Sequence, residues 1–187
     1  MRIVGGDLKG RKLEAPAGRD VRPTSDRARE GIFNILLNGK PDIDFQGITV
    51  LDGFAGTGAL GLEALSRGAA QAVFMESNPA SVDCIRANAE AFKVDARCLI
   101  LRHDALHPGR KPFSMTAPAG LVFLDPPYQQ GLIGPALVAL RDSDWLADGC
   151  VMVIETEAKL ALEIPDGYNL IDSRKYGAAL VTFLRKE

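Results

Sequence analysis

The chain has 187 residues, 47% of them apolar, which suffices for one globular domain with a full core and leaves no room for a second catalytic domain. No apolar run reaches the 18 residues of a membrane span, and the first residues lack the features of a secretory leader, so we expect a cytoplasmic protein with no membrane partner. Three scattered cysteines without Cys-x-x-Cys spacing and two histidines without matching ligands argue against a metal site.

The net charge of −2 conceals an asymmetry about Lys40. Residues 1–40 hold nine Lys or Arg against five Asp or Glu, whereas the remaining residues hold 13 against 19. A basic segment on an acidic body indicates one face for a polyanion. An ordinary solvated surface can have the same composition, so charge alone leaves both interpretations open.

The N-terminal part predicts a small hairpin and one helix. Extended runs at residues 2–6 and 10–14 flank the short Asp7-Leu-Lys9 segment. A loop rich in Pro, Gly and Arg follows. Thr24 and Ser25 can then cap a helix that continues to about Leu37, because apolar residues recur there at helical spacing.

From Ile48 onward the pattern predicts an α/β fold. Short apolar runs alternate with helical segments, which is typical of a parallel sheet with crossover helices. A final pair of extended runs is joined too tightly for a crossover helix, so the last strand must be antiparallel. The expected strands are residues 48–52, 72–76, 96–101, 120–125, 150–155, 169–174 and 178–184, and the expected helices are residues 58–67, 79–92 and 133–140.

A glycine-rich loop after the first of these strands indicates a cofactor. From Gly56 it reads Gly-Thr-Gly-Ala-Leu-Gly, with Glu76 20 positions further on, which is the dinucleotide-binding fingerprint. However, the strand ends at Asp52, several residues too early for that arrangement, and a carboxylate beside a pyrophosphate is unfavourable. The sulfonium and ammonium of S-adenosylmethionine reverse the sign of this interaction. The loop alone therefore favours S-adenosylmethionine, and the next motif decides between the two cofactors.

A second motif, Leu-Asp-Pro-Pro-Tyr at residues 124–128, indicates the substrate. Asp125 ends the fourth strand, at the carboxyl edge where ligands bind in open α/β sheets. Asp125 and the Pro126 carbonyl can each accept an N–H from a planar exocyclic amine, while Tyr128 stacks on the ring. In isolation the motif could be a simple turn. After a glycine loop at the right interval it predicts methyl transfer to an amine nitrogen.

These motifs together resemble the bacterial small-subunit ribosomal RNA (guanine-N2)-methyltransferases. The resemblance also rests on Arg-Ile-Val-Gly-Gly at residues 2–6, on Gly-Arg-Lys-Leu at residues 10–13, and on the Arg-Pro-Thr string that runs from residue 22 to residue 34. It implies a Rossmann-like class I methyltransferase with a seven-stranded, mostly parallel sheet. An RNA-contacting extension (1–40) would precede the methyltransferase domain (41–187). The implied target is the N2 amine of a guanine in 16S ribosomal RNA within a partly assembled small subunit, and a monomer is expected.

The resemblance also assigns site residues by position. Cofactor contacts at the methionine end are expected from Asp52, Gly53, Ala55, Gly56 and Gly58. Contacts to the ribose are expected from Glu76, and contacts to the adenine from Asp104 and Ala105. The catalytic set is Asp125, Pro126 and Tyr128, and the RNA-binding set is Lys9, Arg11, Lys12, Arg22 and Arg27. His103 stands where the family more often has a small residue, so a local capping role is the alternative for Asp104.

Other functions remain open at this point. The amine could belong to adenine N6, cytosine N4 or a protein glutamine. Outside this chemistry, a NAD-dependent oxidoreductase and a non-catalytic RNA-binding module are the alternatives.

Overall fold

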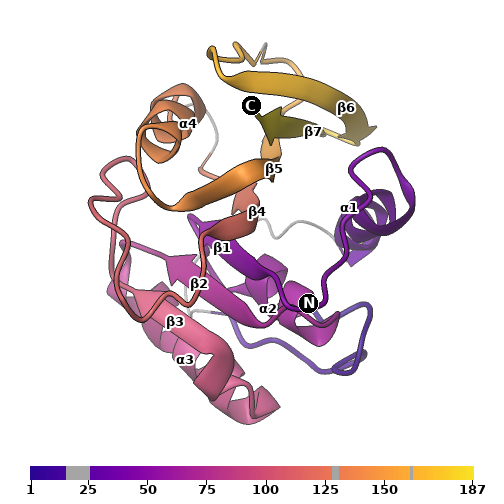
Figure 1. The fold of residues 1–187 in the computed structure, drawn as a ribbon. Coiled ribbons are helices and arrows are strands. Elements are labelled where there is room, and N and C mark those ends of the chain that lie inside the picture. Colours follow the sequence, from indigo (N-terminus) through magenta and orange to yellow (C-terminus); the bar gives the residue numbers. More distant parts are fainter. Residues whose placement is uncertain (16–25, 128–130, 161) are drawn as a thin grey trace.

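The computed structural model describes residues 1–15, 26–127, 131–160 and 162–187 and has one central sheet between helices (Figure 1). The helices are α1 (Asp26–Asn38), α2 (Ala59–Ser66), α3 (Pro79–Phe92), a short 3-10 helix (Asp95–Arg97) and α4 (Ile133–Arg141). The strands are β1 (Thr49–Gly53), β2 (Gln71–Met75), β3 (Cys98–Leu101), β4 (Ala119–Leu124), β5 (Leu146–Glu157), β6 (Tyr168–Tyr176) and β7 (Ala179–Lys186).

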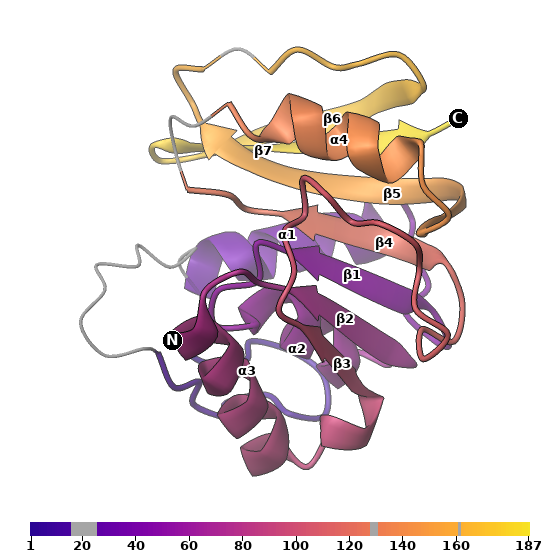
Figure 2. The ribbon, with the colours of Figure 1, turned by 90° about the vertical axis from the view of Figure 1, so that its left-hand side faces the viewer.

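The sheet has the strand order β3-β2-β1-β4-β5-β7-β6. Strands β1 to β5 pair in parallel, whereas β7 lies between β5 and β6 and is antiparallel to both. This confirms the predicted fold class: the tight connection between β6 and β7 leaves no room for a crossover helix. The chain moves outward from β1 through β2 to β3 and then returns to the other side of β1 as β4 (Figure 2). Ligands in open α/β sheets bind at such a reversal of strand order.

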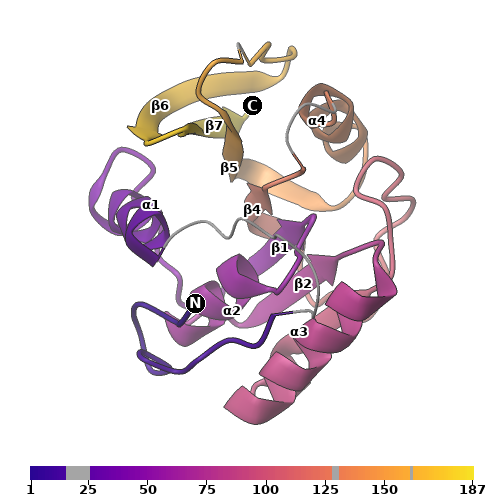
Figure 3. The same cartoon turned by 180° about the vertical axis from the view of Figure 1, so that it is seen from behind.

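Two apolar layers cover the sheet. On one face α1, α2 and α3 pack over side chains such as Phe74 and Phe123 (Figure 3). On the other face α4 and the connection between β3 and β4 pack over Leu124 and Ile154. Phe123 and Leu124 are consecutive and enter opposite layers, as the alternation of side chains along a strand requires. Strands β1 and β4 are therefore almost entirely apolar until they reach their carboxyl ends.

The predicted N-terminal hairpin forms with minimal pairing. Ile3 N–H donates to the Arg11 carbonyl at 2.9 Å and Gly10 N–H donates to the Ile3 carbonyl at 2.9 Å. Outside the named strands, a single antiparallel bridge, between Arg2 and Lys12, is found in the described part of the chain. The turn of the hairpin is instead hydrogen-bonded to the end of α2, where Asp7 N–H donates to the Ser66 carbonyl at 2.8 Å.

A buried carboxylate, Glu63 of α2, anchors this N-terminal segment. Its two oxygens accept the backbone N–H groups of Val4 and Gly5, both at 2.8 Å. Arg67 pairs with it at 2.9 Å, and the fully buried Arg29 of α1 approaches it to 3.8 Å. Arg29 is one of the nine basic residues in segment 1–40 whose excess of positive charge indicated a face for a polyanion. It lies instead inside the protein, where it also pairs with Asp26 and donates to the Arg2 carbonyl.

Other boundaries differ from the prediction by a few residues. The third strand begins at Cys98 because residues 95–97 form the 3-10 turn. Strand β5 begins four residues before the predicted start at Cys150. The predicted start of α3 is confirmed, since the Asn78 side chain accepts the N–H of Ser81 at 3.2 Å. The proposed caps of α1, Thr24 and Ser25, lie outside the described residues.

Candidate active site

Three carboxylates meet at the carboxyl edge of the sheet. Asp52 lies near the end of β1, Glu76 directly follows β2, and Asp125 directly follows β4. The parallel registers pair Gly53 with both Met75 and Leu124, so the ends of these three adjacent strands are level. The two sequence motifs are therefore brought together beside the reversal of strand order, as the strand assignments predicted.

The environment of Asp52 is strongly negative. The residue is 2% exposed, and its carboxylate accepts the N–H of Gly61, in the first turn of α2, at 2.9 Å. Burial raises the pKa of Asp52 well above its usual value; the Gly61 hydrogen bond opposes this shift, and the negative charges of Asp125 and Glu76 add to it. A cation placed among these carboxylates would be stabilised, whereas a pyrophosphate would be repelled.

The loop between β1 and α2 leaves space in front of this edge. Gly56 has φ +56°, and a Cβ built on it would meet only the Phe54 carbonyl oxygen, at 4.0 Å. Gly58 also has positive φ, but a Cβ there would approach Ile85 and Phe74 to 3.2 Å. The first glycine thus keeps the backbone open to a ligand, and the second allows α2 to begin close to the sheet. Phe54 itself has φ +61°, a conformation that costs a non-glycine residue energy and is concentrated at functional sites.

Glu76 holds the loop in place. One of its oxygens accepts the N–H of Gly56 at 2.8 Å and the other accepts the N–H of Asn78 at 2.7 Å. Its carboxylate is therefore a bridge between the loops that follow β1 and β2, a role that the sequence did not reveal. Each oxygen keeps a second lone pair with which it can accept a hydroxyl group. Ala55 is attached to the same strand end, since its N–H donates to the Met75 carbonyl at 3.1 Å.

The two residues expected at the adenine lie beyond β3 and have different surroundings. Asp104 is exposed and accepts the N–H of Leu106 at 2.9 Å, and its other oxygen lies 3.0 Å from His107 Nδ1. The Leu106 N–H is the main reason why the pKa of Asp104 lies below its usual value, and His107 lowers it further. The Asp104 carboxylate thus makes the local capping contacts that were the alternative to contact with the adenine. Ala105 is buried beside Gly53.

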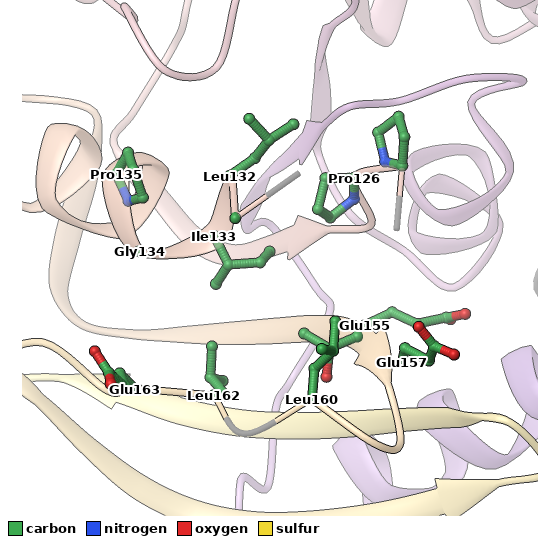
Figure 4. A pocket seen from close by; sticks show the side chains of 13 residues that line it. Pro126, Leu132, Ile133, Gly134, Pro135, Glu155, Glu157, Leu160, Leu162 and Glu163 are labelled. Atoms are coloured by element: carbon green, nitrogen blue, oxygen red, sulfur yellow. The ribbon is translucent and has the colours of Figure 1, made fainter. Parts of the chain in front are cut away.

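A cavity of about 320 Å³ is lined by Pro126, the residue that follows Asp125 in the chain. Pro126 and Pro127 form one side, and the end of β5 forms the other with Glu155 and Glu157 (Figure 4). Its remaining walls are mainly apolar and include Leu132, Ile133, Leu160 and Leu162. The sequence analysis treated residues 150–155 only as a strand. The Glu-Thr-Glu run that ends this strand was the available signal, because charged residues at the carboxyl end of a sheet strand are well placed for ligands.

The predicted RNA-binding residues are only partly collected on one surface. Lys9, Arg11, Lys12 and Arg27 are all exposed. Lys9 and Arg27 line a shallow cavity of about 410 Å³ between the hairpin and α1. Arg11 is held elsewhere: it donates to the Ala91 carbonyl at the end of α3, and its guanidinium lies 5.1 Å from the centre of the Phe92 ring. The predicted residues Arg22 and Tyr128 lie outside the described part of the chain.

Residues 1–185 match a protein family described as conserved hypothetical protein 95. The chain is 35% identical over 188 residues to ribosomal RNA small subunit methyltransferase D of Escherichia coli, an alignment that covers 100% of this chain and 90% of the relative. It is 33% identical to YlbH of Bacillus subtilis, covering 100% of this chain and 99% of that protein.

Solved structures agree with these sequence relatives. The yhhF structure from Escherichia coli superposes with a TM-score of 0.84 at 32% identity, over 100% of this chain and 98% of that one. TrmN from Thermus thermophilus shares the fold, with a TM-score of 0.67 at 22% identity, over 86% of this chain and 48% of TrmN. Among the described residues no helix is long and apolar enough to cross a membrane, and no cluster of metal-ligating side chains is found. The family model and the full-length relatives together show that the chain belongs to the family of the ribosomal RNA small subunit methyltransferases D.

Proposed function

We propose that this protein transfers a methyl group from S-adenosylmethionine to the exocyclic N2 amine of a guanine in 16S ribosomal RNA. The observation that carries the proposal is the convergence of Asp52, Glu76 and Asp125 at the ends of three adjacent strands. The relatives support it, since the E. coli protein is named for methylation of small-subunit ribosomal RNA.

The residues present fit this cofactor better than a dinucleotide. S-adenosylmethionine supplies an electrophilic methyl group on a positively charged sulfur. Asp52 and its acidic neighbours provide the negative field that such a cation requires, and the open face of Gly56 allows the backbone to approach it. Glu76 would accept a ribose hydroxyl while its other contacts fix the loop. The adenine contacts of Asp104 and Ala105 stay a prediction.

Asp125 and the Pro126 carbonyl would orient the amine. The nitrogen lone pair of a planar exocyclic amine is delocalised into its ring, and two acceptors aimed at its N–H groups favour the geometry in which the nitrogen can attack. When bound, S-adenosylmethionine would supply the methyl group: the nitrogen would gain an N–C bond in place of the S–C bond and would release one proton. In this proposal Asp125 would accept that proton. Stacking by Tyr128 is part of this proposal and rests on the sequence motif alone.

Exposed basic residues of the N-terminal segment would bind the RNA backbone. Lys9, Arg27 and Lys12 offer cations on or near the hairpin, and phosphate contacts of this kind supply most of the sequence-independent affinity for nucleic acid. The segment is anchored to α2 through Glu63, so these cations are held in a defined position relative to the catalytic edge.

The proposal is tested by incubating the protein with isotopically labelled S-adenosylmethionine and either naked 16S RNA or isolated small subunits. The RNA is then digested to nucleosides, and the labelled species are identified by mass spectrometry. We expect label in N2-methylguanosine at one position. Label in N6-methyladenosine or N4-methylcytidine, or in protein only, would refute the assigned acceptor. Thermal protection by NAD but not by S-adenosylhomocysteine would refute the cofactor.

A further inference from the structure

The amines that an Asp-Pro-Pro-Tyr site could methylate differ in the chemical group that stands beside the amine. In adenine the N6 amine stands beside N1, in cytosine the N4 amine stands beside N3, and in glutamine the amide nitrogen stands beside its own carbonyl. Each of these neighbours is a hydrogen-bond acceptor. Guanine N2 differs because its neighbour N1 carries a proton and is a donor. A protein site that selects guanine therefore needs a hydrogen-bond acceptor for N1–H, next to the protein group that binds the amine.

The structure places such an acceptor next to Asp125. In the parallel pairing of β4 with β5, Leu124 is opposite Ile154, so Asp125 and Glu155 are the next residues along two neighbouring strands. Neighbouring strands lie about 4.8 Å apart. Atoms N1 and N2 of guanine are bonded to the same carbon, so two carboxylates at this spacing can each accept an N–H from one guanine edge.

The surroundings of Glu155 fit a planar base. Glu155 is 9% exposed and lines the 320 Å³ cavity opposite Pro126 (Figure 4). The apolar side chains of Leu132 and Ile133, at the start of α4, form a wall suited to the face of a ring. Glu155 is already engaged in an interaction in this structure, so a bound base would add to its contacts or exchange with them.

We propose that Glu155 reads guanine by accepting its N1–H, while Asp125 and the Pro126 carbonyl hold the N2 amine. This inference rests on the proposed function and deepens it: Glu155 becomes the residue that selects guanine over the other amine acceptors. A carboxylate in this position rejects an adenine or cytosine edge because two acceptors would then face each other in a partly buried site, each without a donor.

The test uses 2-aminopurine, which keeps the 2-amine but has an unprotonated N1. 16S RNA is prepared with either guanine or 2-aminopurine at the methylated position, in the naked or assembled form that proves active. We expect the wild-type protein to prefer guanine by about 100-fold or more in kcat/KM, the penalty for an unpaired group in a site built to bind it. Equal use of both bases by the wild-type protein would overturn the inference, whatever any variant does.

The variant Glu155→Gln should lose about 10-fold in kcat/KM with guanine, because a neutral amide oxygen is a weaker acceptor for N1–H than a carboxylate. It should lose little or nothing with 2-aminopurine, because the amide can turn and donate to an unprotonated N1. Glu155→Asp keeps a carboxylate and should keep the preference for guanine. The matched control is Glu163→Gln, since Glu163 is an exposed residue at the opposite end of the cavity and takes no part in the proposed contact.

Binding of S-adenosylhomocysteine, measured by calorimetry, shows that each variant is folded. An unchanged base preference in folded Glu155→Gln would overturn the role of Glu155 while leaving the proposed function intact. Failure of the wild-type protein to methylate guanine at all would instead refute the proposed function.

Discussion

The carboxyl group of Asp52 has a cost in stability when it ionises and, in the proposed function, a use in cofactor binding. Its burial raises its pKa, and for an acid this means that folding favours the neutral form. The stability associated with the neutral carboxyl group is fully present below the pKa of the unfolded chain and is lost as the pH rises through the higher pKa of the folded protein. Ionisation of this carboxyl group therefore opposes folding, as is common where binding requires an unfavourable group.

We accordingly predict that Asp52→Asn raises the free energy of unfolding at pH 7 and weakens binding of S-adenosylmethionine. The asparagine oxygen can still accept the N–H of Gly61. Denaturant titrations from pH 4 to pH 8 should show the gain shrinking toward low pH, as the wild-type carboxyl group becomes protonated in the folded state and then in the unfolded state. A loss of stability that is constant across this range would contradict the electrostatic explanation.

Asp125 gives a kinetic prediction. In the proposed function Asp125→Ala would remove one oriented acceptor for the amine, so it should slow methyl transfer by about 100-fold or more, comparable to the loss of one preorganised polar contact. Binding of S-adenosylhomocysteine should change little. Single-turnover rates with saturating RNA separate the chemical step from binding, and near-normal turnover would show that the carboxylate is structural.

Thr156, between Glu155 and Glu157 of β5, has a buried hydroxyl with no hydrogen-bond partner in the described part of the chain. Replacement of an unsatisfied hydroxyl by a methyl group of similar shape is neutral or stabilising. Thr156→Val should therefore leave the free energy of unfolding unchanged or raise it by about 1 kcal/mol, as measured by denaturant titration. A clear decrease would reveal a partner for the hydroxyl.

At the scale of elements, the hairpin, α1 and α2 are joined through Glu63. Its carboxylate is fully buried and compensates the buried Arg29 as well as Arg67. Removal of one partner from a buried ion pair leaves an uncompensated charge and costs about 3–5 kcal/mol. We expect Glu63→Gln to lower the free energy of unfolding by about that amount.

The matched control is Asp83→Asn, which breaks the exposed pair with Arg86 in α3. Exposed ion pairs contribute about 0–1 kcal/mol to the free energy of unfolding. In denaturant titrations this variant should therefore unfold with a midpoint near that of the wild type. Similar losses in both variants would show that Glu63 is not the anchor of the N-terminal segment.

The same hairpin gives a binding prediction. Lys9 and Lys12 are exposed, whereas Arg11 is held against α3. Each phosphate contact to single-stranded RNA adds about 0.7 to the slope of log K against log salt concentration. The double variant Lys9→Ala, Lys12→Ala should weaken RNA binding and flatten that slope by up to about 1.4. Cofactor affinity should stay the same, and an unchanged slope would place RNA recognition elsewhere, most plainly on the closing hairpin around Arg174.

At the scale of the whole molecule, the order of the elements and the class of fold follow from sequence periodicity. Alternating apolar runs and helical segments predicted the parallel sheet, and the short link between the last two strands predicted the antiparallel one. The glycine loop and the Asp-Pro-Pro motif each follow a strand, so both could be assigned to the carboxyl edge from the sequence. Local patterns of this kind depend on neighbours within a few residues, and a sequence displays those neighbours directly.

Tertiary structure alone decided which distant residues share a site. The strand order places Glu155 beside Asp125, although 30 positions separate them. The packing of α1 against α2 buries Arg29 next to Glu63 rather than exposing it on a basic arm. Tertiary packing also places Arg11 on the end of α3 and joins the Gly56 loop to Glu76. These contacts depend on strand register and on which side of each element faces the core. Both result from packing the whole chain at once, so no local stretch of sequence contains them.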